Sequence, residues 1–353
     1  MQLLVIAGDG IGPEITAATI GVLRATDAVF KLGLGFEFMD IGFASLAATG
    51  STCADAVMMR IPQVDGVLLG PVSNADYPPR DQGGSNPSRT IRTTFDLGAN
   101  IRPCRSRPGL TLLRTPMDLI IVRECTEGFY PDRNMHAGIG EFMPDADTAL
   151  AVRKISSRAC RRVAHVAFAL ARTRRSKVAA VHKANVLKMT DGLFLREVRA
   201  VARDYSDVAL DDVLVDAAAA LLIRSPDRFD VIVTTNMFGD ILSDEASELC
   251  GGLGLAGSIN AGDTICVAQA QHGSAPDIAG HGVANPTSLI LSAAMLLAWR
   301  GQRDGNAGVI AAAARIEAAV DTVLADPARR TRDLGGALGT ADFATAVSAA
   351  IAA

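Results

Sequence analysis

The sequence predicts an α/β protein built from two domains. Its length of 353 residues exceeds the roughly 100–200 residues of one typical domain. Short apolar runs alternate with stretches of helical periodicity, which is the pattern of successive strand–helix units. The glycine-rich stretch 251–262 and the loop 74–88 do not have the composition of a tethering linker. We therefore expect the two domains to be intertwined along the chain.

The predicted elements follow from these two periodicities. Apolar runs predict strands at Gln2–Ala7, Asp65–Gly70, Leu119–Val122, Lys177–Val181 and Asp230–Thr235. Helical spacing predicts helices from Pro13 towards Ala28, over Ser88–Asp96, Arg153–Arg172, Asp191–Tyr205 and Met237–Glu248, and in the alanine-rich tail after Asn285. The loop 74–88, rich in proline and glycine, separates a strand from a helix and can form a mobile lip over a site.

Composition and charge exclude several classes of protein. With 49% hydrophobic residues and a formal net charge of −4, the chain is neither mainly disordered nor typical of nucleic-acid binders. The longest apolar run, near Leu289–Trp299, is shorter than the ~18 residues that indicate a membrane span. The N-terminal apolar stretch lacks a preceding basic region and predicts a strand, not a signal peptide. Six scattered cysteines without a CxxC pair indicate free thiols, so we expect a cytoplasmic protein.

A glycine-rich turn, Gly8-Asp9-Gly10-Ile11-Gly12-Pro13-Glu14, follows the first strand. A Rossmann fingerprint would need a third glycine where Pro13 stands, and Asp9 would repel a pyrophosphate. The turn therefore favours a tight strand-to-helix connection, in which glycines adopt unusual backbone angles. A loop that contacts a cofactor in another way is the alternative.

Two carboxylates lie on the predicted helix that follows Asp230–Thr235. Asp240 and Asp244 are four residues apart and project from one helical face. Adjacent carboxylates repel unless a cation joins them, and their hard oxygens suit Mg²⁺ or Mn²⁺. Asp216, at the end of another apolar run, can supply a third oxygen. The simpler alternative is a solvated helix start, where acids favour the positive end of the helix dipole.

Four arginines occur near the ends of predicted elements. They are Arg89, Arg92, Arg102 and Arg123. Guanidinium groups bind carboxylates through a planar pair of hydrogen bonds, so the set suggests a small polyanionic ligand. For any single arginine the simpler interpretation is a salt bridge to a neighbouring acid such as Asp96 or Glu124.

Six segments resemble those of a known family. They read GDGIGPE, IRTTFDLGANIRP, RECTEGFY, HKANVLKMTDGLF, VDAAAALLIRSPDRFDVIVTTNMFGDILSDEASELCGGLGLAGS and HGSAPDIAGHGVANPTSLILSAAMLL, in this order over most of residues 1–300. The chain is similar to the NAD(P)-dependent β-decarboxylating dehydrogenases of 3-substituted malates, the isocitrate/isopropylmalate dehydrogenase family. The resemblance implies an isopropylmalate dehydrogenase-like fold with two intertwined α/β domains and a large mixed sheet, not a standard Rossmann fold. It implies a large cofactor-binding domain at 1–97 and 255–353, and a small domain at 98–254 with the dimer interface and the metal and substrate residues.

The resemblance also implies roles for particular residues. Tyr130 would be the general acid, and Lys183 of the partner subunit would be the base for the substrate's 2-hydroxyl. Mg²⁺ or Mn²⁺ would bind Asp240 and Asp244 of one subunit and Asp216 of the other, which makes the protein a homodimer with shared active sites. The implied substrate residues are Ser88, Arg89, Arg92, Arg102, Arg123 and Asn185. The implied NAD residues are Ile11, His272, Gly273, Ser274, Ala275, Asp277, Ile278 and Asn285.

Two expectations about chemistry accompany these roles. Asp277 favours NAD over NADP, because a carboxylate accepts from a ribose 2′-hydroxyl and repels a 2′-phosphate. A neighbouring cation such as Lys183 is expected to hold the pKa of Tyr130 below its usual value of about 10, and the pairing to lower the lysine's pKa. Three residues depart from those usual in the family and put cofactor geometry and substrate identity in question: His182, Gln269 and Gln271.

The substrate prediction depends on Arg89. The implied reaction converts a 3-substituted (R)-malate, with NAD, to a 2-oxo acid, CO₂ and NADH. An isopropyl group beside Arg89 would strand a charge against apolar surface, so an isocitrate- or homoisocitrate-like substrate is favoured. If Arg89 turns to solvent instead, the pocket is apolar and suits 3-isopropylmalate; tartrate and D-malate are further alternatives. A non-catalytic regulatory subunit is the alternative of another class, against which the retention of Tyr130 and Lys183 argues.

Overall fold

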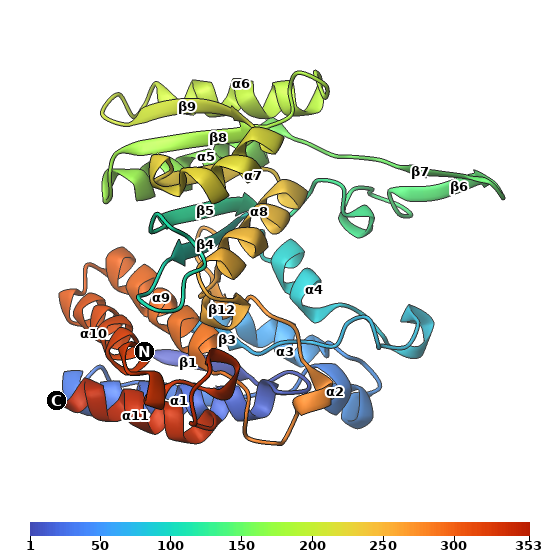
Figure 1. Cartoon of the computed structure of the whole chain (residues 1–353). Helices are drawn as coiled ribbons and strands as arrows, with labels where there is room; N and C mark the ends of the chain where they lie inside the picture. The colour runs from blue at the N-terminus through green and yellow to red at the C-terminus, as the bar shows by residue number, and fades with distance from the viewer. The chain divides into compact units, whose positions relative to one another are not determined.

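The computed structural model describes residues 1–353 apart from the side chain of Pro131. The chain divides into two compact units. Unit 1 comprises Met1–Phe95, Arg107–Leu110 and Gly251–Ala353, and unit 2 comprises Asp96–Ser106 and Thr111–Cys250. Each unit combines helices with parallel and antiparallel strands, which confirms the predicted mixed α/β class (Figure 1).

Unit 1 contains five strands in the order β2-β1-β3-β12-β11. They are β1 (Gln2–Ile6), β2 (Gly35–Phe38), β3 (Gly66–Leu69), β11 (Ile259–Ala261) and β12 (Cys266–Gln269). β1 pairs in parallel with β2 and β3, β3 pairs in parallel with β12, and β11 runs antiparallel to β12. The helices are α1 (Gly12–Phe30), α2 (Gly42–Thr49), α3 (Asp55–Arg60), α4 (Pro87–Thr94), α9 (Thr287–Asp304), α10 (Ala307–Ala325) and α11 (Thr340–Ala352). The first and last helices, α1 and α11, lie side by side (Figure 1).

Unit 2 has a five-stranded arrangement in the order β4-β5-β10-β8-β9. The strands are β4 (Ala99–Arg105), β5 (Asp118–Glu124), β8 (Lys177–His182), β9 (Ala209–Leu214) and β10 (Val231–Thr234). β4 runs antiparallel to β5, and the other neighbours are parallel. A separate antiparallel pair consists of β6 (Glu141–Asp145) and β7 (Thr148–Ala151). The helices are α5 (Ser157–Arg172), α6 (Thr190–Ala202), α7 (Val215–Arg224) and α8 (Asn236–Leu249).

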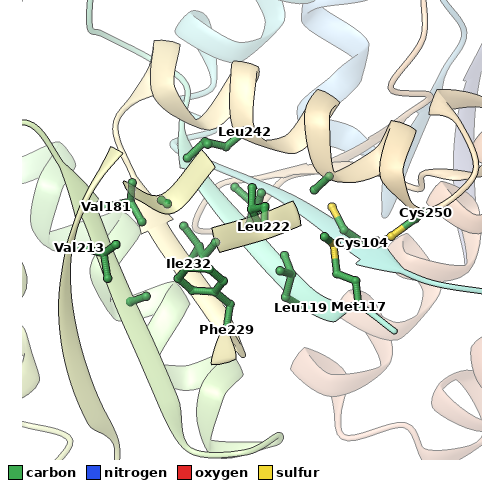
Figure 2. Close-up of a cluster of buried hydrophobic side chains, with 14 residues drawn as sticks. Cys104, Met117, Leu119, Val181, Val213, Leu222, Phe229, Ile232, Leu242 and Cys250 are labelled. Carbon is green, nitrogen blue, oxygen red and sulfur yellow. Dashed lines mark hydrogen bonds between the residues drawn. The ribbon is translucent and has the colours of Figure 1, made fainter. Parts of the chain in front are cut away.

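The core of unit 2 fixes the orientation of α8. Alternate strand residues, including Leu119 of β5 and Ile232 of β10, pack with Leu222 of α7 and Leu242 of α8 (Figure 2). Leu242 is fully buried, and helical geometry turns residues two positions away towards the opposite side. Asp240 and Asp244 are therefore directed away from this core, which makes α8 the support of the site.

Every strand and helix predicted from the sequence is present, with small differences in length. The long helix α5 begins at Ser157 and not at Arg153, because the Ser156 side chain accepts a hydrogen bond from the Ala159 N–H and caps the helix there. The strands β2, β4, β6, β7, β9, β11 and β12 and the helices α2, α3 and α7 were not predicted. Along the described chain, no helix combines the length and apolar character that crossing a membrane requires.

Candidate active site

Two buried arginines of unit 2 hold the carboxylates of α8. Arg123, near the end of β5, donates to Asp240 through Nη1. Nη1 of Arg102, on β4, lies 3.3 Å from Oδ1 of Asp240 and 3.1 Å from Oδ1 of Asp244. The Arg102 and Arg123 side chains are only 7% and 3% exposed. Burial, followed by the charge of Arg123, lowers the pKa of Arg102. This mutual repulsion favours the binding of anions between the two guanidinium groups.

The neighbouring acids considered for these two arginines have other partners. Asp96 forms ion pairs with Arg158 and Arg162. Glu124 accepts hydrogen bonds from the Thr126 and Glu127 N–H groups at 2.8 and 3.0 Å. Local salt bridges therefore do not explain Arg102 and Arg123, whose partners come from α8.

Tyr130 joins the same network. Its hydroxyl donates to Oδ2 of Asp240 at 2.7 Å and accepts from Nη2 of Arg123 at 3.0 Å. Burial raises the pKa of Tyr130; Arg123 opposes this effect and the hydrogen bond to Asp240 adds to it. Within one chain the cations beside the Tyr130 ring are Arg123 and Arg133, and the effect expected of Lys183 from the partner subunit stays a prediction. Tyr130 therefore retains its proton, as a general acid must before it acts.

A second group in unit 2 pairs Lys183 with Asp216. Lys183 follows β8, and Asp216 lies in the first turn of α7, directly after β9. Because β8 and β9 are parallel neighbours, the residues beyond their carboxyl ends come together. Nζ of Lys183 lies 2.7 Å from Oδ1 of Asp216 and lowers the pKa of that carboxyl. Asn185, in the turn after Lys183, is exposed.

The residue before Lys183 supports its backbone. His182 is buried, and its Nδ1 accepts from the Ala184 N–H at 2.9 Å, while its Nε2 contacts Asp212. Since Nδ1 acts as an acceptor, the Nε2 nitrogen carries the ring proton towards Asp212. This departure from the family's usual residue is thus accommodated by local hydrogen bonds.

The donor set of α8 fits a hard divalent cation. Asp240 and Asp244 offer oxygen ligands one turn apart, and both side chains are partly exposed. Among the residues whose side chains are described, no three His, Cys, Asp or Glu groups converge as a metal site. The predicted third ligand, Asp216, was expected from the other subunit of a dimer.

In unit 1, α4 presents the predicted substrate residues Ser88, Arg89 and Arg92. Asn86 caps the helix by accepting from the Arg89 N–H at 3.0 Å. Ser88 and Arg92 are four residues apart and lie on the same helical face. Nη2 of Arg92 donates to Oε1 of Gln269 at 3.1 Å, and Nε2 of Gln269 donates to Oγ of Ser88 at 2.7 Å. The end of β12 therefore orders this face of α4.

The glycine-rich turn meets the predicted cofactor segment at close range. The Ile11 N–H donates to the Ser274 carbonyl at 2.8 Å. Gly10 has a φ of +56°, and a Cβ atom there would lie 2.0 Å from the same carbonyl oxygen, so glycine is required. The buried Asp9 accepts from the Phe43 N–H at 2.9 Å and the Ser73 N–H at 3.1 Å. Asp9 is a structural carboxylate, in line with a tight connection rather than a Rossmann fingerprint.

The other predicted NAD residues follow β12. Burial lowers the pKa of His272, and its Nδ1 contacts the Gly273 carbonyl at 2.9 Å. Ala275, with a φ of +37°, precedes the short 3₁₀ turn Pro276–Ile278, on which Asp277 is exposed. Asn285 donates to Asp333 at 3.0 Å and accepts from the Thr287 N–H at 3.0 Å. These bonds fix the backbone before α9.

Three polar residues of these networks were not predicted from the sequence as site residues. Oδ1 of Asn236 accepts from Nε and Nη2 of Arg123 at 2.9 and 2.6 Å. Ser243 accepts from Nη1 of Arg102 at 2.7 Å. Gln269, noted only as a departure, links Ser88 to Arg92. The sequence feature that could have identified Asn236 and Ser243 as site residues is their position on α8, the helix that carries Asp240 and Asp244.

The paired carboxylates, arginines, tyrosine and lysine are typical of an enzyme that acts on small hydroxy carboxylic acids. Comparison with known proteins agrees: residues 2–347 match the isocitrate/isopropylmalate dehydrogenase family. The chain is 42% identical over 353 residues to "Isocitrate/homoisocitrate dehydrogenase" of Thermus thermophilus, covering 99% of this chain and 98% of the relative. It is 40% identical to "3-isopropylmalate/3-methylmalate dehydrogenase" of Methanocaldococcus jannaschii, covering 98% of each. A crystal structure of isocitrate dehydrogenase from Methylococcus capsulatus superposes with a TM-score of 0.86 at 38% identity, covering 99% of each chain.

The chain belongs to the isocitrate/isopropylmalate dehydrogenase family. The family oxidatively decarboxylates 3-substituted malates and generally uses NAD and a divalent metal. The protein is accordingly an NAD-dependent decarboxylating dehydrogenase, and the predicted family and fold are confirmed.

Proposed function

We propose that the enzyme oxidatively decarboxylates a 3-substituted (R)-malate whose third substituent carries a negative charge, as in isocitrate or homoisocitrate. The polar character of α4 carries this proposal, since the helix bears Ser88, Arg89 and Arg92 within two turns. An apolar substituent against these groups would leave polar atoms without partners, which is costly. The 42% identity to a relative named for isocitrate and homoisocitrate supports the same choice.

The common malate carboxylates are assigned to Arg92, Arg102 and Arg123. Guanidinium groups bind carboxylates with charge-assisted hydrogen bonds, and burial strengthens these interactions. In the ligand-free chain Arg102 and Arg123 are paired with Asp240 and Asp244. Substrate carboxylates would take over these pairings and release the aspartates.

Proton transfers are assigned to Tyr130 and Lys183. NAD, held by the unit 1 residues assigned to it, would supply hydride acceptance, and a divalent cation held by Asp216, Asp240 and Asp244 would supply Lewis acidity. Lys183 takes the proton of the 2-hydroxyl as a neutral amine, after its ion pair with Asp216 is released and its own ammonium proton has passed to water. Tyr130 donates a proton to C3 after CO₂ has left, since its phenol is protonated in the resting network.

The enzyme is further proposed to be a homodimer that shares its active sites. In unit 2 the β6–β7 pair exposes Phe142 (51%), Met143 (62%) and Leu150 (47%). Ile223 of α7 and Ile241 of α8 are also exposed. Exposed apolar groups of this size indicate a protein–protein contact. A second copy would supply Lys183 and Asp216 to the carboxylates of α8, with unit 2 as the interface and unit 1 as the cofactor-binding part.

A cytoplasmic location is part of the proposal. All six cysteines are free thiols, five of them buried. Thiols persist in reducing compartments, whereas oxidising ones favour disulfides.

The substrate assignment is tested with Arg89→Leu. A charge-assisted hydrogen bond from Arg89 to an anionic third substituent contributes about 1.5–3 kcal/mol. The variant should therefore lose roughly ten- to a hundredfold in kcat/KM for isocitrate and homoisocitrate and should gain activity on 3-isopropylmalate. Arg92→Leu is the matched control, since loss of a common carboxylate contact should impair every substrate alike.

The measurement is kcat/KM for isocitrate, homoisocitrate, 3-isopropylmalate, tartrate and D-malate in the wild type and both variants. A wild type that prefers 3-isopropylmalate, with the ranking unchanged by Arg89→Leu, would show that Arg89 does not read the substrate. The absence of turnover on the whole panel would favour a regulatory subunit instead.

A further inference from the structure

We infer that Gln269 is a positioning residue for substrate specificity, which sets the direction of the Ser88 hydroxyl. The amide leaves the Ser88 proton available as a donor to an oxygen of the substrate's anionic third substituent. This inference rests on the proposed function and names a further residue that enforces it.

Gln269 is held rigidly at the end of β12. Its N–H donates to the Ser258 carbonyl at 3.1 Å, and its carbonyl accepts from the Ser292 hydroxyl at 3.2 Å. Its side chain is buried and makes two hydrogen bonds, to Arg92 and to Ser88 on one face of α4. The amide therefore has no freedom to exchange these partners without breaking both bonds.

The arginine determines which end of the amide faces which partner. A guanidinium group can only donate, so the atom of Gln269 that is 3.1 Å from Nη2 of Arg92 must be the carbonyl oxygen Oε1. The NH₂ group consequently faces Ser88 and donates to its Oγ at 2.7 Å. A hydroxyl that accepts this bond keeps its own proton for another acceptor.

The nature of that acceptor follows from the chemistry of the face. Ser88 and Arg92 both present donors on the same side of α4, and a carboxylate is an acceptor without donors. A carboxylate at residue 269 would have the opposite effect, because it cannot donate and would draw the Ser88 proton to itself. Glutamine at this position thus adapts the face to an anionic substituent.

The near-isosteric substitution Gln269→Glu tests the inference. We expect the KM for isocitrate and homoisocitrate to rise about ten- to a hundredfold, because the hydroxyl then offers lone pairs to a carboxylate. The KM for D-malate, which lacks the third substituent but also needs Arg92, should rise by a clearly smaller factor than the KM for isocitrate. A melting curve verifies that the variant is folded.

A double-mutant cycle separates this effect from simple charge repulsion. Ser88→Ala removes the hydroxyl and should raise the same KM values, and Gln269→Glu should add little in the Ser88→Ala background. Gln269→Leu, which adds neither charge nor acceptor, should be milder than Gln269→Glu. Additive effects of Ser88→Ala and Gln269→Glu would contradict the inference.

The remaining outcomes distinguish the inference from the proposed function. Equal losses on isocitrate and D-malate in Gln269→Glu would show a merely structural role and overturn the inference, while the substrate assignment would stand. A wild type that does not turn over substrates with an anionic third substituent would overturn the proposed function and the inference with it.

Discussion

At the scale of single residues, the protonation states in the site are set by partners from distant parts of the chain. Tyr130 meets Asp240 across 110 positions and keeps its proton because it is buried and donates to a carboxylate. Lys183 is paired with Asp216 across parallel strands and lowers the pKa of that carboxyl. The residues assigned to the two proton transfers are thus held by two different carboxylates, Asp240 and Asp216.

Cofactor choice is a prediction at the same scale. Asp277 is exposed on the turn Pro276–Ile278, within the segment assigned to the adenosine ribose. We expect kcat/KM with NAD to exceed that with NADP at least tenfold, equivalent to about 1.4 kcal/mol. Asp277→Ala should reduce this preference, and steady-state kinetics with both cofactors measure it.

The control for this variant is Asp304→Ala. Asp304 is the last residue of α9, and Asn285, which is assigned to the cofactor site, lies just before the first turn of that helix. Because a helix rises roughly 1.5 Å per residue, Asp304 lies far from Asn285. Its removal should leave the preference unchanged. Equal kcat/KM values with NAD and NADP in the wild type would refute the role of Asp277.

The candidate residues could be predicted from spacing and resemblance, but their pairings could not. The four-residue spacing placed Asp240 and Asp244 on one helical face, which the structure has. Spacing gives no information on contacts across more than a hundred positions, so Asp240 was not recognised as the partner of Arg123. For the same reason Gln269 was seen only as an unusual residue.

At the scale of elements, the sequence reveals strands that are both buried and continuously apolar; the mostly buried strand β4 was missed because Asn100 and Arg102 interrupt its apolar residues. The strands β1, β5 and β10 are almost wholly buried, so their apolar runs identify them directly. The β6 and β7 strands are exposed throughout, and without a buried face they have no alternating pattern to detect. Such strands need a covering surface to bury their apolar side chains.

The β6–β7 pair provides the prediction at this scale. The double substitution Phe142→Asp and Leu150→Asp should weaken dimerisation at least tenfold, because charges would replace the apolar side chains proposed to meet the second copy. Analytical ultracentrifugation over a range of concentrations measures the dissociation constant.

Phe38→Asp is the matched control for this pair. Phe38 is 60% exposed on β2 of unit 1, which is not assigned to the interface. Its substitution should leave the dissociation constant unchanged. A double variant on β6–β7 that dimerises as tightly as wild type would remove this pair from the interface.

At the scale of the whole molecule, the proposed active site needs two copies of the chain. Asp240, Asp244 and Tyr130 of one copy are proposed to work with Lys183 and Asp216 of the other. This arrangement explains why the residues form two separate groups within unit 2, around Asp240 and around Lys183. It also makes activity a property of the dimer, which inactive variants can restore in each other.

The most direct test of this central claim is complementation between inactive variants. Asp240→Asn and Lys183→Ala should each abolish turnover. In a purified heterodimer of the two, both substitutions fall in one shared site and the other site is intact, so about half of the wild-type activity should return. In the Asp216→Asn and Lys183→Ala heterodimer each site carries one substitution, and no activity should return. An inactive first heterodimer, or an active second one, would contradict the shared site.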